Sequence, residues 1–450
     1  MKIKSDSRLI KKGDTFIALP GLKSDGHDYV DDAIKKGACK VIVERGTFKV
    51  PTIYVSDTQK YLEEYLKEYY QAKIASLILI GVTGTNGKTT SCYLLYQMLN
   101  KLNIDTAYIG TLGFYLKDKI MKLNHTTPDL LTLYQLLLQA KKEKIKYVVM
   151  EVSSHALKLG RVKGLKFNYA IFTNLSSEHL DFHYHLDDYI ASKAKLFKMI
   201  TNAGLAIINN DDPYQAKIIT DGDVLTYGFK ESDFTISKEE LNDQGTSFIL
   251  NYNNQEYLIK SPLIGRHNIY NLLTMIIVLF KIGFSLEIII AKIPLLKAPP
   301  GRMDTIIFND KKVIIDYAHT PDAVFNIIKA VKKLAKGYLY SIIGCGGNRD
   351  KSKRSLMTFY AMALSDKVII TSDNPRFEEV ETIIDDMLKG NVKNNYQVII
   401  DRKKAIKHGL HLLTKDDILL ILGKGHERYQ IIGSKKIYHN DKEYVLSIIK

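Results

Sequence analysis

Cysteine is scarce in this chain of 450 residues. Only three cysteines are present, far apart and without any Cys-x-x-Cys pair: Cys39, Cys92 and Cys345. This spacing excludes a disulfide framework and a cysteine-ligated metal centre, and it is typical of proteins from a reducing compartment.

Long apolar runs are also missing. Three charged residues interrupt the most apolar region, 271–296: Lys281, Glu287 and Lys292. A membrane-spanning helix needs about 20 predominantly apolar residues in a row. The opening stretch MKIKSDSRLI also lacks the apolar segment of a signal peptide. We therefore predict no membrane span and a cytoplasmic location.

The charge balance is strongly positive, with a formal net charge of +15. Lysine supplies most of the positive charge, and the lysines are spread along the chain without a long like-charged block. A dispersed lysine excess is more typical of a solvated surface than of a nucleic-acid groove. We expect no nucleic-acid partner, but a P-loop NTPase that binds nucleic acid stays open as an alternative of a different class.

The chain is too long for one compact core, and its pattern predicts three α/β domains. Residues 1–74 form a small α/β domain. Residues 75–297 alternate buried strands with helices, which indicates a P-loop ATPase-like parallel sheet. Within them, residues 220–260 favour a small antiparallel insertion. A linker at 296–304, rich in proline and glycine, leads to a Rossmann-like doubly wound domain at 298–450.

The stretch GVTGTNGKTT joins an apolar strand to a helix. Gly84 and Gly87 let backbone N–H groups approach a phosphate at a helix N-terminus. Lys88 can reach the terminal phosphates, and Thr89 can ligate Mg²⁺. Val82 stands where the first glycine of the standard loop would be. Because a strand and a helix flank it, the stretch predicts ATP or GTP binding rather than a chance turn.

Polar residues follow the next strands, where ligands of open α/β sheets gather. Glu151 ends the strand YVVME and can hold Mg²⁺, although it can equally cap the helix that follows. Asn174, His179 and Asp181 follow the strand YAIF. Oxygen and imidazole ligands suit a metal, but a lone His–Asp pair is more often structural.

Motifs in order along the chain resemble the Mur ligases, the ATP-dependent amide-forming enzymes of peptidoglycan synthesis. GTNGKTT, EVSSHAL, TNLSSEHLDFH and YIASKAKLF are similar to the family as a whole. Nine further stretches resemble its tripeptide-synthetase branch: SDSRLIKKGDTFIALPG, GHDY, HTTPD, GRHNIYNLL, PGRMD, DYAHTPDA, GCGGNRDKSKR, TSDNPR and GKGHERYQ. The resemblance implies a ligase that uses ATP to activate a carboxylate as an acyl phosphate, which an amine then attacks.

The resemblance also implies two Mg²⁺ ions and a CO₂-derived carbamate on a lysine. It assigns catalysis and metal binding to one set: Lys88, Thr89, Glu151, His179 and the carbamylated Lys193. It assigns ATP to a second set: Gly84, Thr85, Asn86, Gly87, Lys88, Thr89, Thr90, Asn268, Asn271, Arg302, Asp316 and His319. A carbamate suits Mg²⁺ because it turns a cation into an oxygen-bearing anion. Lys195 as the modified residue, and Lys193 as a plain solvated lysine, stay open.

For the acid substrate, the resemblance implies UDP-N-acetylmuramoyl-L-alanyl-D-glutamate. It assigns this molecule to Ser7, Thr126, Thr127, Ser153 and Arg161. The lead-in before Ser7 is short for the family, and Leu159 stands where a glutamine is common. The short lead-in leaves the uridine contact open, and we expect Leu159 to remove one polar contact with this substrate.

For the amine, the resemblance implies meso-diaminopimelate. It assigns this substrate to Arg349, Asp373, Asn374, Pro375, Arg376, Gly423 and Glu427. A guanidinium at position 376 can bind the distal carboxylate of diaminopimelate bidentately and would repel the ammonium end of lysine. Lysine or another diamino acid stays open as acceptor, and so does folylpolyglutamate synthesis, which the N-terminal motifs disfavour. We expect small-molecule substrates only and a monomer.

Overall fold

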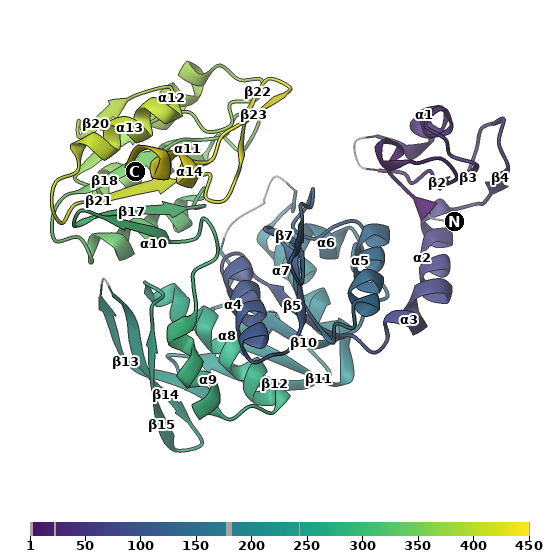
Figure 1. Ribbon diagram of the computed structural model, residues 1–450, viewed down its shortest axis with the longest axis horizontal. Coiled ribbons are helices and arrows are strands. Elements are labelled where there is room, and N and C mark those ends of the chain that lie inside the picture. The colour runs from purple at the N-terminus through teal and green to yellow at the C-terminus, as the bar shows by residue number, and fades with distance from the viewer. Residues whose placement is uncertain (1–2, 22–23, 177–181, 243, 450) are drawn as a thin grey trace.

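The computed structural model describes residues 3–21, 24–176, 182–242 and 244–449. Three α/β units follow one another along the chain, each with its own large sheet. The N-terminal and C-terminal units lie on different sides of the central unit, and a helical segment joins the first two (Figure 1). The predicted three-domain α/β architecture is confirmed.

The N-terminal unit is built on four parallel strands in chain order: β1 (Ile3–Lys4), β2 (Thr15–Ile17), β3 (Lys40–Val43) and β4 (Thr52–Tyr54). Three short helices accompany them: η1 (Ser7–Leu9), η2 (Gly26–Tyr29) and α1 (Val30–Lys35). Helix α1 packs on the sheet because Val30 and Ala33 are buried with Phe16 and Val41. The segment to the central unit is helical: α2 (Thr58–Leu66), the π-helical η3 (Lys67–Gln71) and α3 (Ala72–Ile74).

The central unit contains a sheet of eleven strands in the order β15-β14-β13-β12-β11-β10-β5-β9-β6-β7-β8. Their bounds are β5 (Ile78–Thr83), β6 (Thr106–Gly110), β7 (Gly113–Leu116), β8 (Lys119–Met121), β9 (Tyr147–Glu151), β10 (Phe167–Phe172), β11 (Ile200–Asn209), β12 (Asp223–Gly228), β13 (Phe234–Asn242), β14 (Gly245–Tyr252) and β15 (Gln255–Ser261). The strands from β6 to β13 in this order are parallel, and each edge is antiparallel.

Helices cover both faces of this sheet. They are α4 (Lys88–Lys101), α5 (Leu130–Lys142), α6 (Ser154–Lys158), α7 (Leu186–Ala194), η4 (Lys195–Met199), η5 (Gln215–Lys217), α8 (Arg266–Ile282), α9 (Leu286–Lys292) and η6 (Ile293–Leu295). Helices α4 and α8 share one apolar core with the sheet, whereas α5 and α7 belong to a second core. Because both faces are buried, the central strands are continuously apolar rather than alternating.

The C-terminal unit has six strands in the order β16-β17-β21-β18-β19-β20 and a separate hairpin. The strands are β16 (Asp304–Phe308), β17 (Lys311–Asp316), β18 (Leu339–Ile343), β19 (Lys367–Ile370), β20 (Tyr396–Val398) and β21 (Ile418–Leu422), and the hairpin is β22 (Tyr429–Ile432) with β23 (Lys435–Tyr438). The helices are α10 (Pro321–Lys332), α11 (Lys353–Leu364), α12 (Val380–Leu388), α13 (Arg402–Leu412) and α14 (Asp441–Ile449). Only β16 runs antiparallel to its neighbour in the six-stranded sheet.

The antiparallel segment expected within 220–260 is present as β13 to β15. Strand β12 pairs in parallel with β11, and β13 to β15 continue the same sheet as its edge. The sequence did not predict that these strands continue the central sheet, because periodicity shows local strands but not whether their outer hydrogen bonds extend a neighbouring sheet. Among the described residues, no helix combines the length and apolar character that crossing a bilayer demands.

Candidate active site

The turn between β5 and α4 has the geometry of a phosphate-binding loop. Gly87 precedes the helix with φ +87°, a left-handed conformation that glycine adopts without strain. A Cβ atom on Gly84 would lie 1.9 Å from Oγ1 of Thr173, so only glycine fits there. Lys88 Nζ donates to the carbonyl oxygens of Gly84 and Thr85, at 2.7 Å each. The predicted phosphate residues 84–90 therefore surround the N-terminus of α4.

The end of β10 holds this loop in place. Asn174 Oδ1 accepts from Asn86 N at 2.9 Å, and Thr173 Oγ1 donates to Asn86 O at 2.6 Å. Asn174 was a candidate metal ligand from the sequence, but its side chain here serves the phosphate loop. His179 and Asp181, the other candidates of this stretch, lie outside the described residues.

Glu151 lies at the end of β9, beside β5 in the sheet, and is 1% exposed. Its Oε2 accepts from Thr89 Oγ1 at 2.8 Å, and its Oε1 accepts from Tyr108 OH at 2.5 Å and Thr111 N at 2.8 Å. Burial and the Glu151 charge raise the pKa of Tyr108 well above its usual value, so this phenol stays a donor. The alternative that Glu151 caps the next helix is wrong, because Ser153 caps α6.

Lys193 lies in the last turn of α7 and is 1% exposed. Its Nζ donates to Gly84 O at 2.7 Å and lies 4.3 Å from the centre of the Tyr189 ring. The alternative of a solvated Lys193 is therefore wrong. Lys195 begins η4 and is exposed. The described residues contain no group of three or more His, Cys, Asp or Glu side chains suited to a metal.

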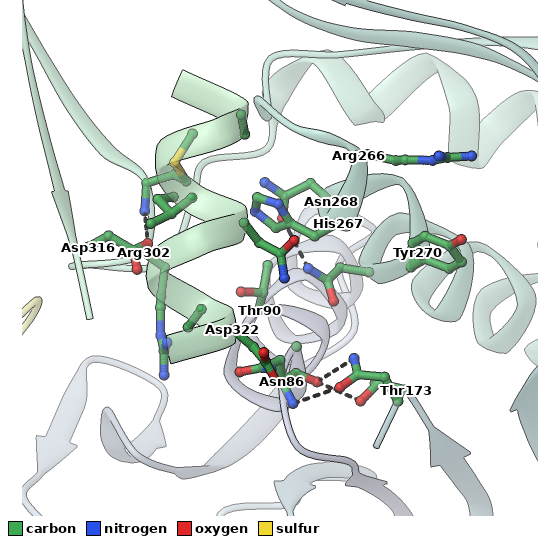
Figure 2. A pocket seen from close by; sticks show the side chains of 18 of the residues that line it. Asn86, Thr90, Thr173, Arg266, His267, Asn268, Tyr270, Arg302, Asp316 and Asp322 are labelled. Carbon is green, nitrogen blue, oxygen red and sulfur yellow. Dashed lines mark hydrogen bonds between the residues drawn. The ribbon is translucent and has the colours of Figure 1, made fainter. Parts of the chain in front are cut away.

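A cavity of about 590 Å³ opens beside the phosphate loop. One wall comes from the central unit, including Asn86, Thr90 and residues of α8, and the other from the C-terminal unit, including Arg302, Asp316 and α10. Figure 2 shows α10 facing the first turn of α8 across this space, with His267 and Asn268 between them. The cavity adjoins the expected phosphate position and is large enough for a nucleoside.

The predicted ATP residues of the later motifs divide into two groups. Asn268 and Asn271 line the cavity, and their side chains are joined by a 3.0 Å hydrogen bond from Asn271 Nδ2 to Asn268 Oδ1. Arg302 also lines it and stacks over the Tyr317 ring at 4.8 Å. His319 is not among the lining residues, and its Nδ1 lies 2.9 Å from Tyr317 O. Thr320, not His319, caps α10.

Four of the five residues predicted for the muramoyl substrate lie together. Thr127 Oγ1 donates to Glu151 O at 2.8 Å and accepts from Ser153 N at 3.1 Å, while Arg161 Nη1 donates to Thr127 O at 3.1 Å. Thr126 Oγ1 lies 3.1 Å from the hydroxyl of Thr111, which also contacts Glu151. Ser7 lies apart, in the N-terminal unit, where it donates to Asp32 at 2.8 Å.

The residues predicted for the diamino acid gather at the strand ends of the C-terminal sheet. Asn374 Nδ2 donates to Glu427 Oε2 at 3.0 Å, and a Cβ atom on Gly423 would lie 2.8 Å from Asp373 Oδ2. The peptide oxygen of Pro375 lies against Gly347, in the loop that carries the exposed Arg349.

Arg376 belongs to this cluster. It has φ +55°, a left-handed value that is uncommon for a residue with a side chain. Its Nη1 donates to Gly347 O at 2.7 Å. Burial, and next the charge of Arg349, lower the pKa of Arg376 from its ordinary value, although a guanidinium remains charged in proteins. The cluster therefore presents charges of both signs.

Comparison with known families covers most of the chain. Residues 2–74 match the Mur ligase family, catalytic domain; residues 82–279 match the Mur ligase middle domain; and residues 301–425 match the Mur ligase, glutamate ligase domain. The chain belongs to the Mur ligase family. The family assignment made from the motifs is confirmed.

This Mur ligase matches several relatives over almost its whole length. It is 41% identical over 452 residues to UDP-N-acetylmuramoyl-L-alanyl-D-glutamate–2,6-diaminopimelate ligase of Fusobacterium nucleatum, covering 98% of this chain and 92% of the relative. A solved structure of a ligase with that name is 33% identical with TM-score 0.69, covering 100% of this chain and 94% of the other. The structure of the MurF ligase of Thermotoga maritima in complex with ADP is 19% identical with TM-score 0.70, covering 100% of this chain and 96% of the other. At this identity the similarity shows the shared fold alone.

The sequence did not single out some residues that the structure places at the candidate sites. His267 and Tyr270 line the cavity. Asn326 of α10 lines the opposite wall. Lys424 lies between predicted diamino-acid residues. His267 and Lys424 lie inside the motifs GRHNIYNLL and GKGHERYQ, so their place in a motif could have marked them as site residues. Nothing in the local sequence marks Asn326.

Proposed function

We propose that this Mur ligase joins meso-diaminopimelate to UDP-N-acetylmuramoyl-L-alanyl-D-glutamate, at the expense of ATP, in peptidoglycan precursor synthesis. The observation that carries this proposal is the position of Arg376 beside Asn374, which bonds Glu427. The distal end of meso-diaminopimelate bears a carboxylate and an ammonium. A guanidinium matches the first group and a carboxylate matches the second.

The chemistry needs activation, because a carboxylate is a poor electrophile at neutral pH. Transfer of the γ-phosphoryl group of ATP to the glutamyl carboxylate gives an acyl phosphate. The neutral amine attacks it, the amide forms through a tetrahedral intermediate, and orthophosphate leaves. The protein's contribution is alignment and charge neutralisation. Lys88, held over the phosphate loop, supplies one positive charge.

The oxygen donors at the loop suit Mg²⁺. The Thr89 hydroxyl and the Glu151 carboxylate lie within hydrogen-bonding distance of each other, and oxygen ligands are those that Mg²⁺ prefers. An unmodified Lys193 does not fit beside a divalent cation, whereas its carbamate does. Bound Mg²⁺ would neutralise charge on the phosphates. We propose that Thr89, Glu151, His179 and the carbamylated Lys193 hold two such ions.

We propose that each of the three units binds a different part of the substrates. Residues 1–74 bind the uridine end of the acid substrate through Ser7, residues 75–297 bind ATP and the muramoyl peptide, and residues 298–450 bind the amino acid and close over ATP. The cavity between the second and third units supports the ATP assignment. Both nucleotide substrates are cytoplasmic metabolites, so we place the reaction in the cytoplasm.

A substrate panel tests the proposed function. The purified protein is supplied with UDP-N-acetylmuramoyl-L-alanyl-D-glutamate, ATP, Mg²⁺ and either meso-diaminopimelate or L-lysine, and phosphate release and product mass are measured. We expect the diaminopimelate-containing product, with one orthophosphate released per amide formed. Better use of lysine would refute the role given to Arg376, and no amide with either amino acid would refute the ligase proposal.

A further inference from the structure

Lys424 is completely buried among the residues assigned to the diamino acid. Its side chain is 0% exposed. The Nζ atom lies 3.3 Å from Asp373 Oδ1, 3.0 Å from Asn374 Oδ1 and 3.1 Å from Glu427 Oε2. A lysine ammonium has three donors, and each finds an acceptor here. Lys424 therefore joins the two loops that supply this cluster.

The two carboxylate side chains are slightly exposed, whereas the lysine side chain is not. The side chains of Asp373 and Glu427 are 10% and 15% exposed. The lysine is more deeply buried than either carboxylate, so the carboxylates are the groups through which a ligand would feel its charge.

The charges around the distal end of the diamino acid can be counted if the exposed Arg349 is left to the ligand's other carboxylate. Asp373 and Glu427 contribute two negative charges and Lys424 one positive charge, which leaves one negative charge for one ligand ammonium. Arg376 supplies one positive charge for one ligand carboxylate. The sum matches the distal end of a diamino acid that carries a second carboxylate. Without Lys424 the carboxylates would keep a second negative charge, which would repel that group.

We infer that Lys424 is a positioning residue that sets the charge of the amine-binding end and thereby favours a dicarboxylic diamine over lysine. The inference rests on the proposed function and adds a second determinant of specificity to Arg376. Lys424 acts through Asp373 and Glu427 and does not touch the substrate. Removing the buried Lys424 charge would leave the two carboxylates unbalanced. The resulting repulsion would weaken the binding of a ligand that brings a further negative charge.

The test compares Lys424→Met with Lys424→Arg, which keeps the charge, and with Lys389→Met, an exposed lysine after α12. For each variant, kcat and KM are measured with meso-diaminopimelate and with L-lysine as acceptor. In Lys424→Met we expect the ratio of the two kcat/KM values to shift toward lysine by at least about tenfold, mainly through KM for diaminopimelate. We expect Lys424→Arg to keep most of the discrimination and Lys389→Met to match the wild type.

A purely structural role predicts a different result. Equal losses for both amino acids in Lys424→Met, with an unchanged ratio, would overturn the inference. If circular dichroism shows that Lys424→Met does not fold, Lys424→Gln takes its place, and a wild-type ratio there overturns the inference as well. If the wild type ligates neither amino acid, the proposed function fails. Calorimetric binding of meso-diaminopimelate and L-lysine to the same variants then decides the charge inference by itself.

Discussion

Lys88 and Lys193 direct their ammonium groups at one atom, the carbonyl oxygen of Gly84, at 2.7 Å each. The first belongs to the phosphate loop and the second to α7, more than a hundred residues later. Two like charges that share one acceptor in a buried place repel each other. A carbamate on Lys193 would replace this repulsion by attraction, which is a physical reason for the modification independent of any metal.

The first prediction concerns Lys193. We expect Lys193→Ala to lower kcat by two orders of magnitude or more, because the proposed carbamate is lost. Added bicarbonate or a short carboxylate should restore part of the activity by supplying the missing anion. Phosphate release in a steady-state assay measures both effects. Lys195→Ala is the matched control, since this lysine is exposed, and full activity of Lys193→Ala would refute the carbamate.

The second prediction concerns Glu151. Replacing it by glutamine keeps its size but removes the charge beside the Thr89 hydroxyl. We expect kcat to fall about 100-fold, with little change in KM for the amino acid, because the lost charge serves phosphoryl transfer. The dependence of the rate on Mg²⁺ concentration should also move to higher values. Glu143→Gln, at an exposed ion pair, is the control; a wild-type magnesium dependence in Glu151→Gln would contradict the assignment.

The third prediction concerns Arg376. In Arg376→Lys we expect KM for meso-diaminopimelate to rise by at least about tenfold, with a smaller change in kcat, because an ammonium cannot reproduce the bidentate fork. Initial rates over a range of amino-acid concentrations give both constants. Arg428→Lys, at a side chain that is 68% exposed, should behave as the wild type. An unchanged KM in Arg376→Lys would mean that the distal carboxylate binds elsewhere.

The fourth prediction concerns the pH dependence of stability. Hydrogen bonding from Arg354 lowers the pKa of Glu378 from its ordinary 4.5 to about 2. Since the folded-state pKa lies below the unfolded value, the stabilisation is fully present above about pH 4.5 and is lost as the pH falls toward 2. Urea unfolding at a series of pH values should therefore show a steeper acid loss of unfolding free energy in the wild type than in Glu378→Gln. Parallel curves would contradict the pairing.

Much of the fold could be read from the sequence because buried parallel strands leave continuous apolar runs, as in β5, β9 and β10. The phosphate loop was visible for the same reason, since its glycines are local requirements. The sheet order was not visible: the pairing of β5 with β9 and with β10 depends on contacts between segments far apart in the sequence. Pattern reasoning also missed the hairpin of β7 and β8, whose exposed tip lacks an apolar signal.

The candidate site divides in the same way. Residues fixed by local geometry, such as Gly87, could be assigned from one motif. Residues that matter through a distant partner could not: the hydrogen bond of Thr89 to Glu151 and that of Lys193 to Gly84 both join separate elements. Lys424 illustrates the limit, because a lysine in a glycine-rich turn is ordinarily solvated, and only the packing of three neighbouring side chains buries it.

The cavity beside the phosphate loop has one wall in each of two units. An inhibitor that fills this cavity would contact the central and the C-terminal unit at once. Its residence time would therefore depend on the relative orientation of the two units. Resistance would then not require a change in any lining side chain. A substitution in the 296–304 connection that alters the angle between the two units would weaken binding of such an inhibitor. The same change would weaken nucleotide binding, so resistance of this kind would also reduce activity.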